Sequence, residues 1–133
     1  MTDIHADDFA LTPNTSKDLI DCMKEGRLDS ISIVANMSCF DECMDMLYEV
    51  IPSLPFLPKM SVHLNLVEGL RLSDENSPLD LSWKDLFLCS YLPSSGDGIR
   101  GFLEREIRAQ IEKCTKATDR CISIAAQHNI SCL

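Results

Sequence analysis

The stretch Ile31-Ser32-Ile33-Val34-Ala35 is mostly apolar and rich in β-branched side chains. A short run of this kind between turn-forming residues is typical of a strand buried in a sheet. The segments on either side have helical spacing instead. Residues 19–25 keep that spacing up to Gly26, a natural helix stop, and residues 39–51 keep it up to Pro52, which ends a helix.

Two further strand patterns flank this central unit. Residues 3–9 resemble a short strand that ends in acidic side chains, and residues 60–66 alternate apolar and polar side chains. We expect the first helix to begin at Thr15 or Ser16, whose hydroxyl groups suit an N-cap. Strands that alternate with helices favour a parallel sheet with right-handed crossovers. The sequence therefore predicts an α/β fold, either a small open sheet or a partial (β/α) barrel.

The C-terminal half is less regular. Residues 70–98 are rich in Ser, Asp, Pro and Gly, so we expect a loop-rich excursion with a short helix near residues 83–89. Long loops inside compact domains are often lids or binding loops. Residues 101–118 predict a helix, and residues 121–126 a weak strand within a divergent tail, 118–133. The apolar stripe expected on the helix consists of Leu103, Ile107, Ile111 and Cys114.

Length and charge limit the classes of function. A chain of 133 residues predicts one domain, residues 1–133. The net charge of −9, from 12 basic and 21 acidic residues, opposes nucleic-acid binding, which draws on clustered Lys and Arg. No apolar run approaches the roughly 20 residues that span a bilayer, and Met1-Thr2-Asp3 does not open a signal peptide. We expect no membrane partner and a cytoplasmic location.

The seven cysteines are an odd number without a signal peptide, which predicts free thiols rather than disulfides. Cys39 and Cys43 lie four residues apart, yet no second Cys or His pair follows at zinc-site spacing. Most of the cysteines are therefore expected to be buried as small apolar side chains.

Asp7 and Asp8 lie at the predicted carboxyl end of the first strand. In parallel α/β folds that end faces the ligand crevice. One carboxylate could hold a hard divalent cation while the other takes a proton from an attacking water. A solvated turn is the alternative for an isolated Asp-Asp pair.

His63 ends the third predicted strand in the same position at the rim. Neutral imidazole is a common ligand of divalent metals, although a lone histidine can also be a hydrogen-bonded structural residue. Asn65 and Glu68 follow at the rim and could bind substrate hydroxyl groups or orient the site. Glu68 with Gly69 could equally form a plain turn.

Four blocks of the chain are similar, in the same order, to the YdjC/ChbG-like carbohydrate deacetylases. His5-Ala6-Asp7-Asp8-Phe9-Ala10-Leu11-Thr12 resembles their Asn-Ala-Asp-Asp-Phe-Gly-Leu-Ser/Thr opening, and residues 29–37 resemble their second strand. Val62-His63-Leu64-Asn65-Leu66-Val67-Glu68-Gly69 is similar to their Gly-x-His-Leu-Asn-Leu-Thr-Glu-Gly block, and residues 106–112 match a helix before their fourth strand.

The resemblance implies a barrel-like fold and removal of N-acetyl groups from amino sugars such as chito-oligosaccharides. It implies that Asp8 and His63 bind a divalent metal, Mg²⁺ or Zn²⁺, and that Asp7 is the general base. The metal would polarise the amide carbonyl and activate water. An acetylated amino sugar would be the substrate.

Three departures from the family pattern stand out. The family Asn is His5 here, which could contact the metal or simply fill the Asn position, and the family Gly is Ala10, which would strain a turn that prefers Gly. The family's Asp-Ser-His-x-His block, which supplies the third ligand, has no counterpart in residues 121–129, where His128 is the one imidazole.

Two functions from different classes therefore follow from the sequence. The chain is either a metal-dependent hydrolase of acetylated amino sugars, complete or truncated, or a non-catalytic remnant that binds a partner or forms a homo-oligomer. A third ligand near Asp8 and His63 would favour the enzyme. An uncovered sheet edge or apolar face would favour association.

Overall fold

Strands and helices alternate through the first half of the chain, as the sequence predicts. The structure, a computed structural model, describes residues 2–74, 77–91 and 97–133. Its first elements are β1 (His5–Phe9), α1 (Pro13–Lys24), β2 (Ser30–Val34), α2 (Phe40–Val50), the short 3-10 helix η1 (Ile51–Ser53) and β3 (Lys59–His63). They are followed by β4 (Leu70–Arg71), β5 (Ser77–Pro78), α3 (Trp83–Tyr91) and α4 (Asp97–Gln127).

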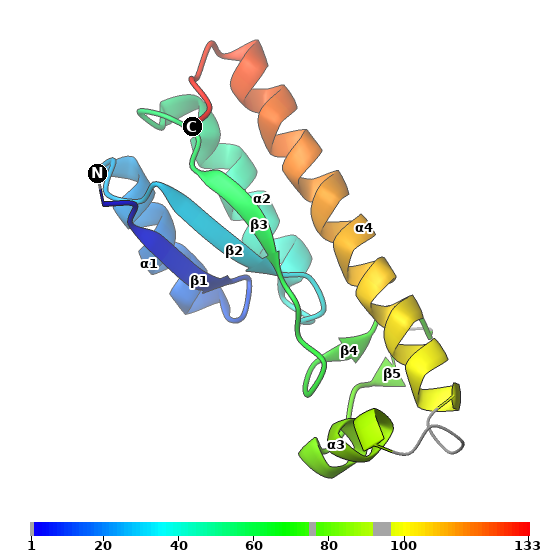
Figure 1. Ribbon diagram of the computed structural model, residues 1–133. Helices are drawn as coiled ribbons and strands as arrows, with labels where there is room; N and C mark the ends of the chain where they lie inside the picture. Colours follow the sequence, from blue (N-terminus) through cyan, green and yellow to red (C-terminus); the bar gives the residue numbers. More distant parts are fainter. Residues whose placement is uncertain (1, 75–76, 92–96) are drawn as a thin grey trace.

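The main sheet has the order β1-β2-β3, and both pairs of neighbours are parallel. β4 and β5 form a separate antiparallel pair. The predicted α/β class with crossover helices is confirmed. Among the described residues the sheet stays open and no barrel closes, because only three strands pair side by side (Figure 1).

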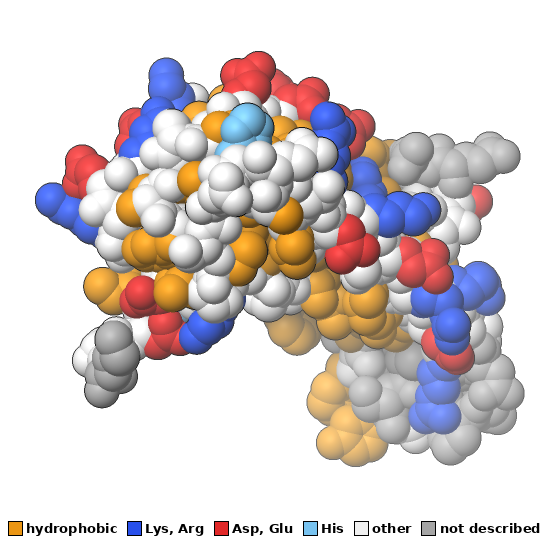
Figure 2. Space-filling model, turned by 90° about the horizontal axis from the view of Figure 1, so that it is seen from above, with side chains coloured by type: hydrophobic (Ala, Val, Ile, Leu, Met, Phe, Trp, Pro, Cys, Tyr) orange, Lys and Arg blue, Asp and Glu red, His pale blue; other side chains and the backbone are white. Residues whose placement is uncertain are grey.

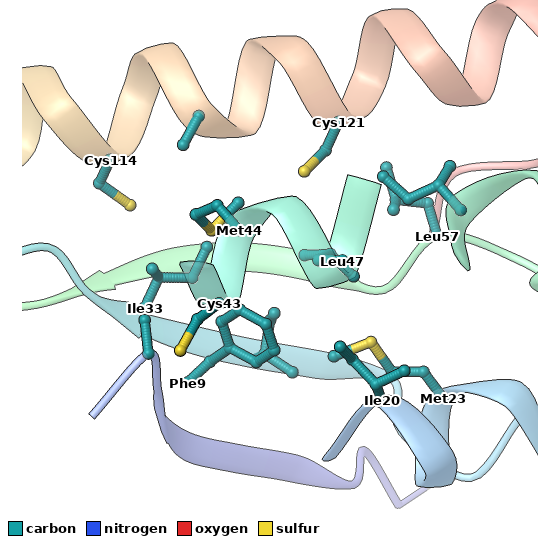
Figure 3. Packing of buried hydrophobic residues seen from close by; sticks show 14 of the residues in the cluster. Phe9, Ile20, Met23, Ile33, Cys43, Met44, Leu47, Leu57, Cys114 and Cys121 are labelled. Atoms are coloured by element: carbon teal, nitrogen blue, oxygen red, sulfur yellow. The ribbon is translucent and has the colours of Figure 1, made fainter. Parts of the chain in front are cut away.

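The hydrophobic core lies between the sheet and the helices. Ile31 and Ile33 of β2 are fully buried, and they join Phe9, Met44 and Leu47 in one cluster. Figure 3 shows Cys114 and Cys121 of α4 pointing into this cluster. Each fully buried side chain of the size of Leu or Phe contributes about 1.5–3 kcal/mol. Side chains from α1, α2 and α4 therefore pack in one cluster against this face of the sheet.

The first helix begins earlier than the sequence pattern suggests. Thr12, not Thr15 or Ser16, is the N-cap, and its Oγ1 accepts a hydrogen bond from the backbone N–H of Thr15 at 3.1 Å. Pro13 follows at the first helical position, where its missing N–H costs nothing. The hydroxyl of Ser16 instead accepts the N–H of Ala10. Ala10 has a φ of 70°, the left-handed conformation expected where the family has Gly.

The helix α4 continues well past residue 118, so the weak strand expected at residues 121–126 is wrong. The helix α4 has 31 residues, and its Cys121 and Ala125 are fully buried against the core. The expected apolar stripe is also displaced, because Ile111 is 43% exposed. The buried line runs instead through Glu106, Gln110, Cys114, Ala117, Cys121 and Ala125. Glu106 and Gln110 are polar, so apolar periodicity does not mark this buried line.

The last residues return to the sheet. Asn129 adopts a φ of 55°, and the N–H of Ile130 donates to the carbonyl of Ala125 at 2.8 Å, which closes the helix. Cys132 then forms a parallel bridge with Leu57, just ahead of β3. The tail is therefore held in the fold.

Charged side chains are distributed over the surface. Figure 2 looks onto the end of the sheet where the strands begin and shows acidic and basic side chains interspersed around the rim. Among the described residues, no helix is both long and apolar enough to cross a membrane. The cysteines whose side chains are described are all free thiols, as predicted.

Candidate active site

An irregularity in β1 brings Asp7 and Asp8 to one side of the sheet. Ala6 pairs with Ile31 but Phe9 pairs with Ile33, so β1 has one more residue than β2 in this interval. Asp8 adopts a φ of 65°, which a non-glycine residue holds only at a cost in energy. Such a bulge redirects side chains at the edge of a sheet. Neighbouring side chains that would point to opposite faces of a regular strand therefore approach the same point.

Both carboxylates approach the side chain of His63. His63 is the last residue of β3, and its Nδ1 lies 3.6 Å from Oδ1 of Asp7 and 3.6 Å from Oδ1 of Asp8. Each of the three side chains is partly exposed. The structure thus brings together the three residues that the sequence singled out, from two strands that are not neighbours in the sheet.

Ser32 of β2 connects the two outer strands. Its hydroxyl donates to Oδ1 of Asp7 at 2.7 Å and lies 3.2 Å from Nδ1 of His63. The hydroxyl has a single proton, so while it donates to Asp7 it can only accept from His63. Ser32 escaped the sequence analysis because it lies inside an apolar strand, although its alternation with Ile31 and Ile33 places it on the opposite face.

Asp7 is held in its ionised form. The hydrogen bond from Ser32 is the main cause that lowers the pKa of Asp7, and a hydrogen bond from His5 is the second. Nε2 of His5 lies 3.1 Å from Oδ1 of Asp7, and its Nδ1 lies 2.7 Å from the hydroxyl of Ser30. His5 therefore lies beside the cluster and contacts the carboxylate of Asp7.

The loop after β3 is fastened by its own side chains. Oδ1 of Asn65 faces the N–H groups of Val67 and Glu68, both at 3.4 Å. The side-chain amide of Asn36 donates to the carbonyl oxygen of Glu68 at 2.9 Å. Asn65 is buried, so of the two roles open to it the structure favours orienting the loop over binding a hydroxyl group.

Two buried residues of α4 hold this loop and the residues that follow β4. Gln110 donates to the carbonyl of Asn65 at 2.7 Å and accepts its N–H at 3.0 Å. Glu106 accepts the N–H groups of Leu72 and Ser73 at 3.1 and 3.0 Å. Burial raises the pKa of Glu106, but hydrogen bonds from Gln110, Ser73 and Leu72 outweigh it and leave the pKa below its ordinary value.

A cleft of about 430 Å³ opens beside the cluster. Asp8 and His63 line one side, the loop that contains Asn65 and Glu68 lines another, and Trp83 and Leu86 of α3 reach it from the excursion. The volume is within the usual range of ligand sites, about 300–1,000 Å³. The arrangement is suited to binding a small polar molecule against ionisable groups.

A model of the family described as YdjC-like protein matches residues 3–128. This chain belongs to the YdjC-like family. It is 37% identical over 70 residues to a protein of Thermoanaerobacter pseudethanolicus (strain ATCC 33223 / 39E) named "Carbohydrate deacetylase". The match covers 53% of this chain and 26% of that relative, so the chain spans only part of the relative's length. No solved structure matches the chain.

Asp8 and His63 carry side chains of the kinds that bind divalent metals in proteins. Carboxylates and imidazole suit Zn²⁺, and Mg²⁺ prefers carboxylate oxygen and water. Oδ1 of Asp8 lies 3.6 Å from Nδ1 of His63. However, in the described part of the chain no three side chains of His, Cys, Asp or Glu are arranged to hold a metal together.

His128 does not complete this YdjC-like site. It follows the end of α4, in a turn bonded to Ile124 and Ala125, and the next residues pair with Leu57 ahead of β3. That is the end of the sheet where the strands begin, whereas His63 lies where β3 ends (Figure 1). The geometry therefore does not support His128 as a replacement ligand.

Proposed function

We propose that this chain carries catalytic residues of a metal-dependent hydrolase that removes N-acetyl groups from amino sugars. The observation that carries the proposal is the meeting of Asp7, Asp8 and His63 beside a cleft of ligand size. The name of the relative, "Carbohydrate deacetylase", supports the same class of reaction.

Each residue of the cluster has a role in the proposed reaction. Asp8 and His63 would hold a divalent cation, Mg²⁺ or Zn²⁺, which when bound polarises the amide carbonyl and lowers the pKa of water. Asp7, which accepts a hydrogen bond from Ser32, would take the proton of the attacking water. His5 contacts the same carboxylate oxygen, Oδ1 of Asp7, as Ser32 does.

The first test is metal-dependent stability. A ligand that binds only the folded state raises its melting temperature. Melting curves should be recorded with and without Zn²⁺ or Mg²⁺ for the wild type, Asp8→Ala and His63→Ala. Asp18→Ala is a matched control, since Asp18 is exposed on α1, and His128→Ala is a second, exposed at the far end of the sheet.

We expect metal to stabilise the wild type and both controls, and the gain to disappear in Asp8→Ala and His63→Ala. If these two variants keep the full gain, the metal binds elsewhere and the proposal fails. Release of acetate from acetylated chito-oligosaccharides then tests the reaction. With two protein ligands, water must fill most of the coordination shell, so the assay should use millimolar metal.

A second candidate function, self-association, is favoured by a surface groove on α4. The groove has a volume of about 680 Å³ and is lined by Leu103, Ile107 and Ile111 among charged side chains. Ile111 is 43% exposed. Sedimentation of the wild type and Ile111→Glu tests this alternative, which predicts a dimer that the substitution dissociates.

A further inference from the structure

The helix α3 exposes large aromatic side chains. Trp83 is 80% exposed, Phe87 62% and Tyr91 70%, at intervals of four residues. The rings of Phe87 and Tyr91 contact each other with centroids 4.7 Å apart, whereas Trp83 lies nearer the cleft. An exposed aromatic group that no packing requirement explains often marks a binding surface.

Trp83 belongs to two adjoining hollows. It lines the cleft that contains Asp8 and His63, and it also lines an apolar groove of about 650 Å³ on α3. Leu86 is the other residue common to both. The groove therefore adjoins the candidate active site at Trp83 and Leu86, and a ligand that extends from the cleft on this side would meet the indole ring.

We propose that Trp83 stacks against the sugar unit next to the one that reacts, at the place where the cleft meets the groove. This inference rests on the proposed function. A pyranose ring presents several C–H groups on one face, and their partial positive charge is attracted to the negative face of an indole ring. The cleft holds the unit that reacts beside Asp8 and His63, while Trp83 supports the neighbouring unit.

The chain contains a single tryptophan, so its fluorescence reports on this position alone. The fluorescence of the wild type should be titrated with N-acetylglucosamine and its β-1,4-linked dimer, trimer and tetramer. We expect a saturable change in intensity or wavelength, with affinity that rises from the monosaccharide to the trimer. Fluorescence that stays constant through the titration overturns the proposal.

Calorimetry measures the contribution of the ring. Loss of the stacked indole ring in Trp83→Ala should lower the affinity for the trimer about tenfold. Trp83→Phe keeps an aromatic ring and should recover most of that affinity. Tyr91→Ala is the matched control, since Tyr91 is a similarly exposed aromatic residue of the same helix. Equal affinity in wild type and Trp83→Ala, or an equal loss in Tyr91→Ala, overturns the proposal.

The outcome is separable from that of the proposed function. Metal stabilisation that depends on Asp8 and His63, without a role for Trp83, leaves the hydrolase and removes the stacking site. Sugar binding that depends on Trp83, in a chain without metal stabilisation, leaves the stacking site and removes the metal-dependent reaction.

Discussion

Oδ1 of Asp8 lies 3.6 Å from Nδ1 of His63, although the strands that carry them are separated by β2. The approach depends on the extra residue in β1, which turns Asp8 toward the face where Asp7 already lies. The same bulge leaves Asp7 bonded to Ser32. The two carboxylates therefore have different surroundings, which suits a division between metal binding and proton transfer.

Asp7→Asn tests this division. Asn has nearly the same shape as Asp, but its amide cannot take up a proton as a carboxylate does. We expect the release of acetate to fall at least about 100-fold while the metal-dependent gain in melting temperature remains. Asp18→Asn, at an exposed position of α1, should change neither. Unchanged turnover in Asp7→Asn would assign the base to another residue.

Glu106→Gln should destabilise the fold. Glu106 accepts two backbone N–H groups and the amide of Gln110, and an amide at this position would turn an N–H toward one of these donors. The expected loss is about 1–3 kcal/mol in urea unfolding. Glu112→Gln, exposed on the same helix, should stay within about 0.5 kcal/mol of the wild type. Similar losses in both variants would contradict the role given to Glu106.

The stabilisation of the fold by Glu106 should depend on pH. Its pKa in the folded state is lower than the ordinary 4.5. Folding therefore favours the ionised form, so the stabilisation is complete above about pH 4.5 and is lost as the pH falls through the folded pKa. The difference in unfolding free energy between wild type and Glu106→Gln should shrink below pH 4.5. A difference that is constant from pH 7 to pH 3 would argue against this assignment.

Gly69→Ala should be strongly destabilising. Gly69 has a φ of 88°, and an added Cβ would lie 2.6 Å from the carbonyl oxygen of Asn36. The backbone of Asn36 cannot move aside as a flexible side chain can, so the loop beside His63 must shift. We expect this shift to lower the free energy of unfolding by about 2 kcal/mol or more. Gly98→Ala, with nothing within 4 Å, should stabilise α4 by up to about 1 kcal/mol. Thermal melts of both variants check the contrast.

Thiol reactivity should follow burial. Burial raises the pKa of Cys121 to about 12 and that of Cys43 to about 11, so neither forms thiolate at pH 8. Cys132 is exposed. Mass spectrometry after brief alkylation should find Cys132 modified, and Cys43 and Cys121 modified only in denaturant. Rapid labelling of Cys121 in the native protein would mean that α4 separates from the core.

Local patterns predicted most of the elements correctly. The apolar run in β2 and the helical spacing of α2 are signals within ten or so residues, and the structure confirms both. The errors arose where a local pattern was incomplete. The N-cap moved to Thr12 because of Pro13, and α4 was cut short because Glu106 and Gln110 occupy its buried side.

The sequence alone determined the alternation of strands and helices as far as β3, and it pointed to Asp7, Asp8 and His63 near the ends of two of these strands. These follow from side-chain periodicity, which neighbours in the chain encode. Only the tertiary structure decided that a bulge turns both carboxylates to one face, that Ser32 joins them to His63, and that His128 lies at the far end. These relationships join residues 25 or more positions apart, so packing across the sheet sets them and no local pattern records them.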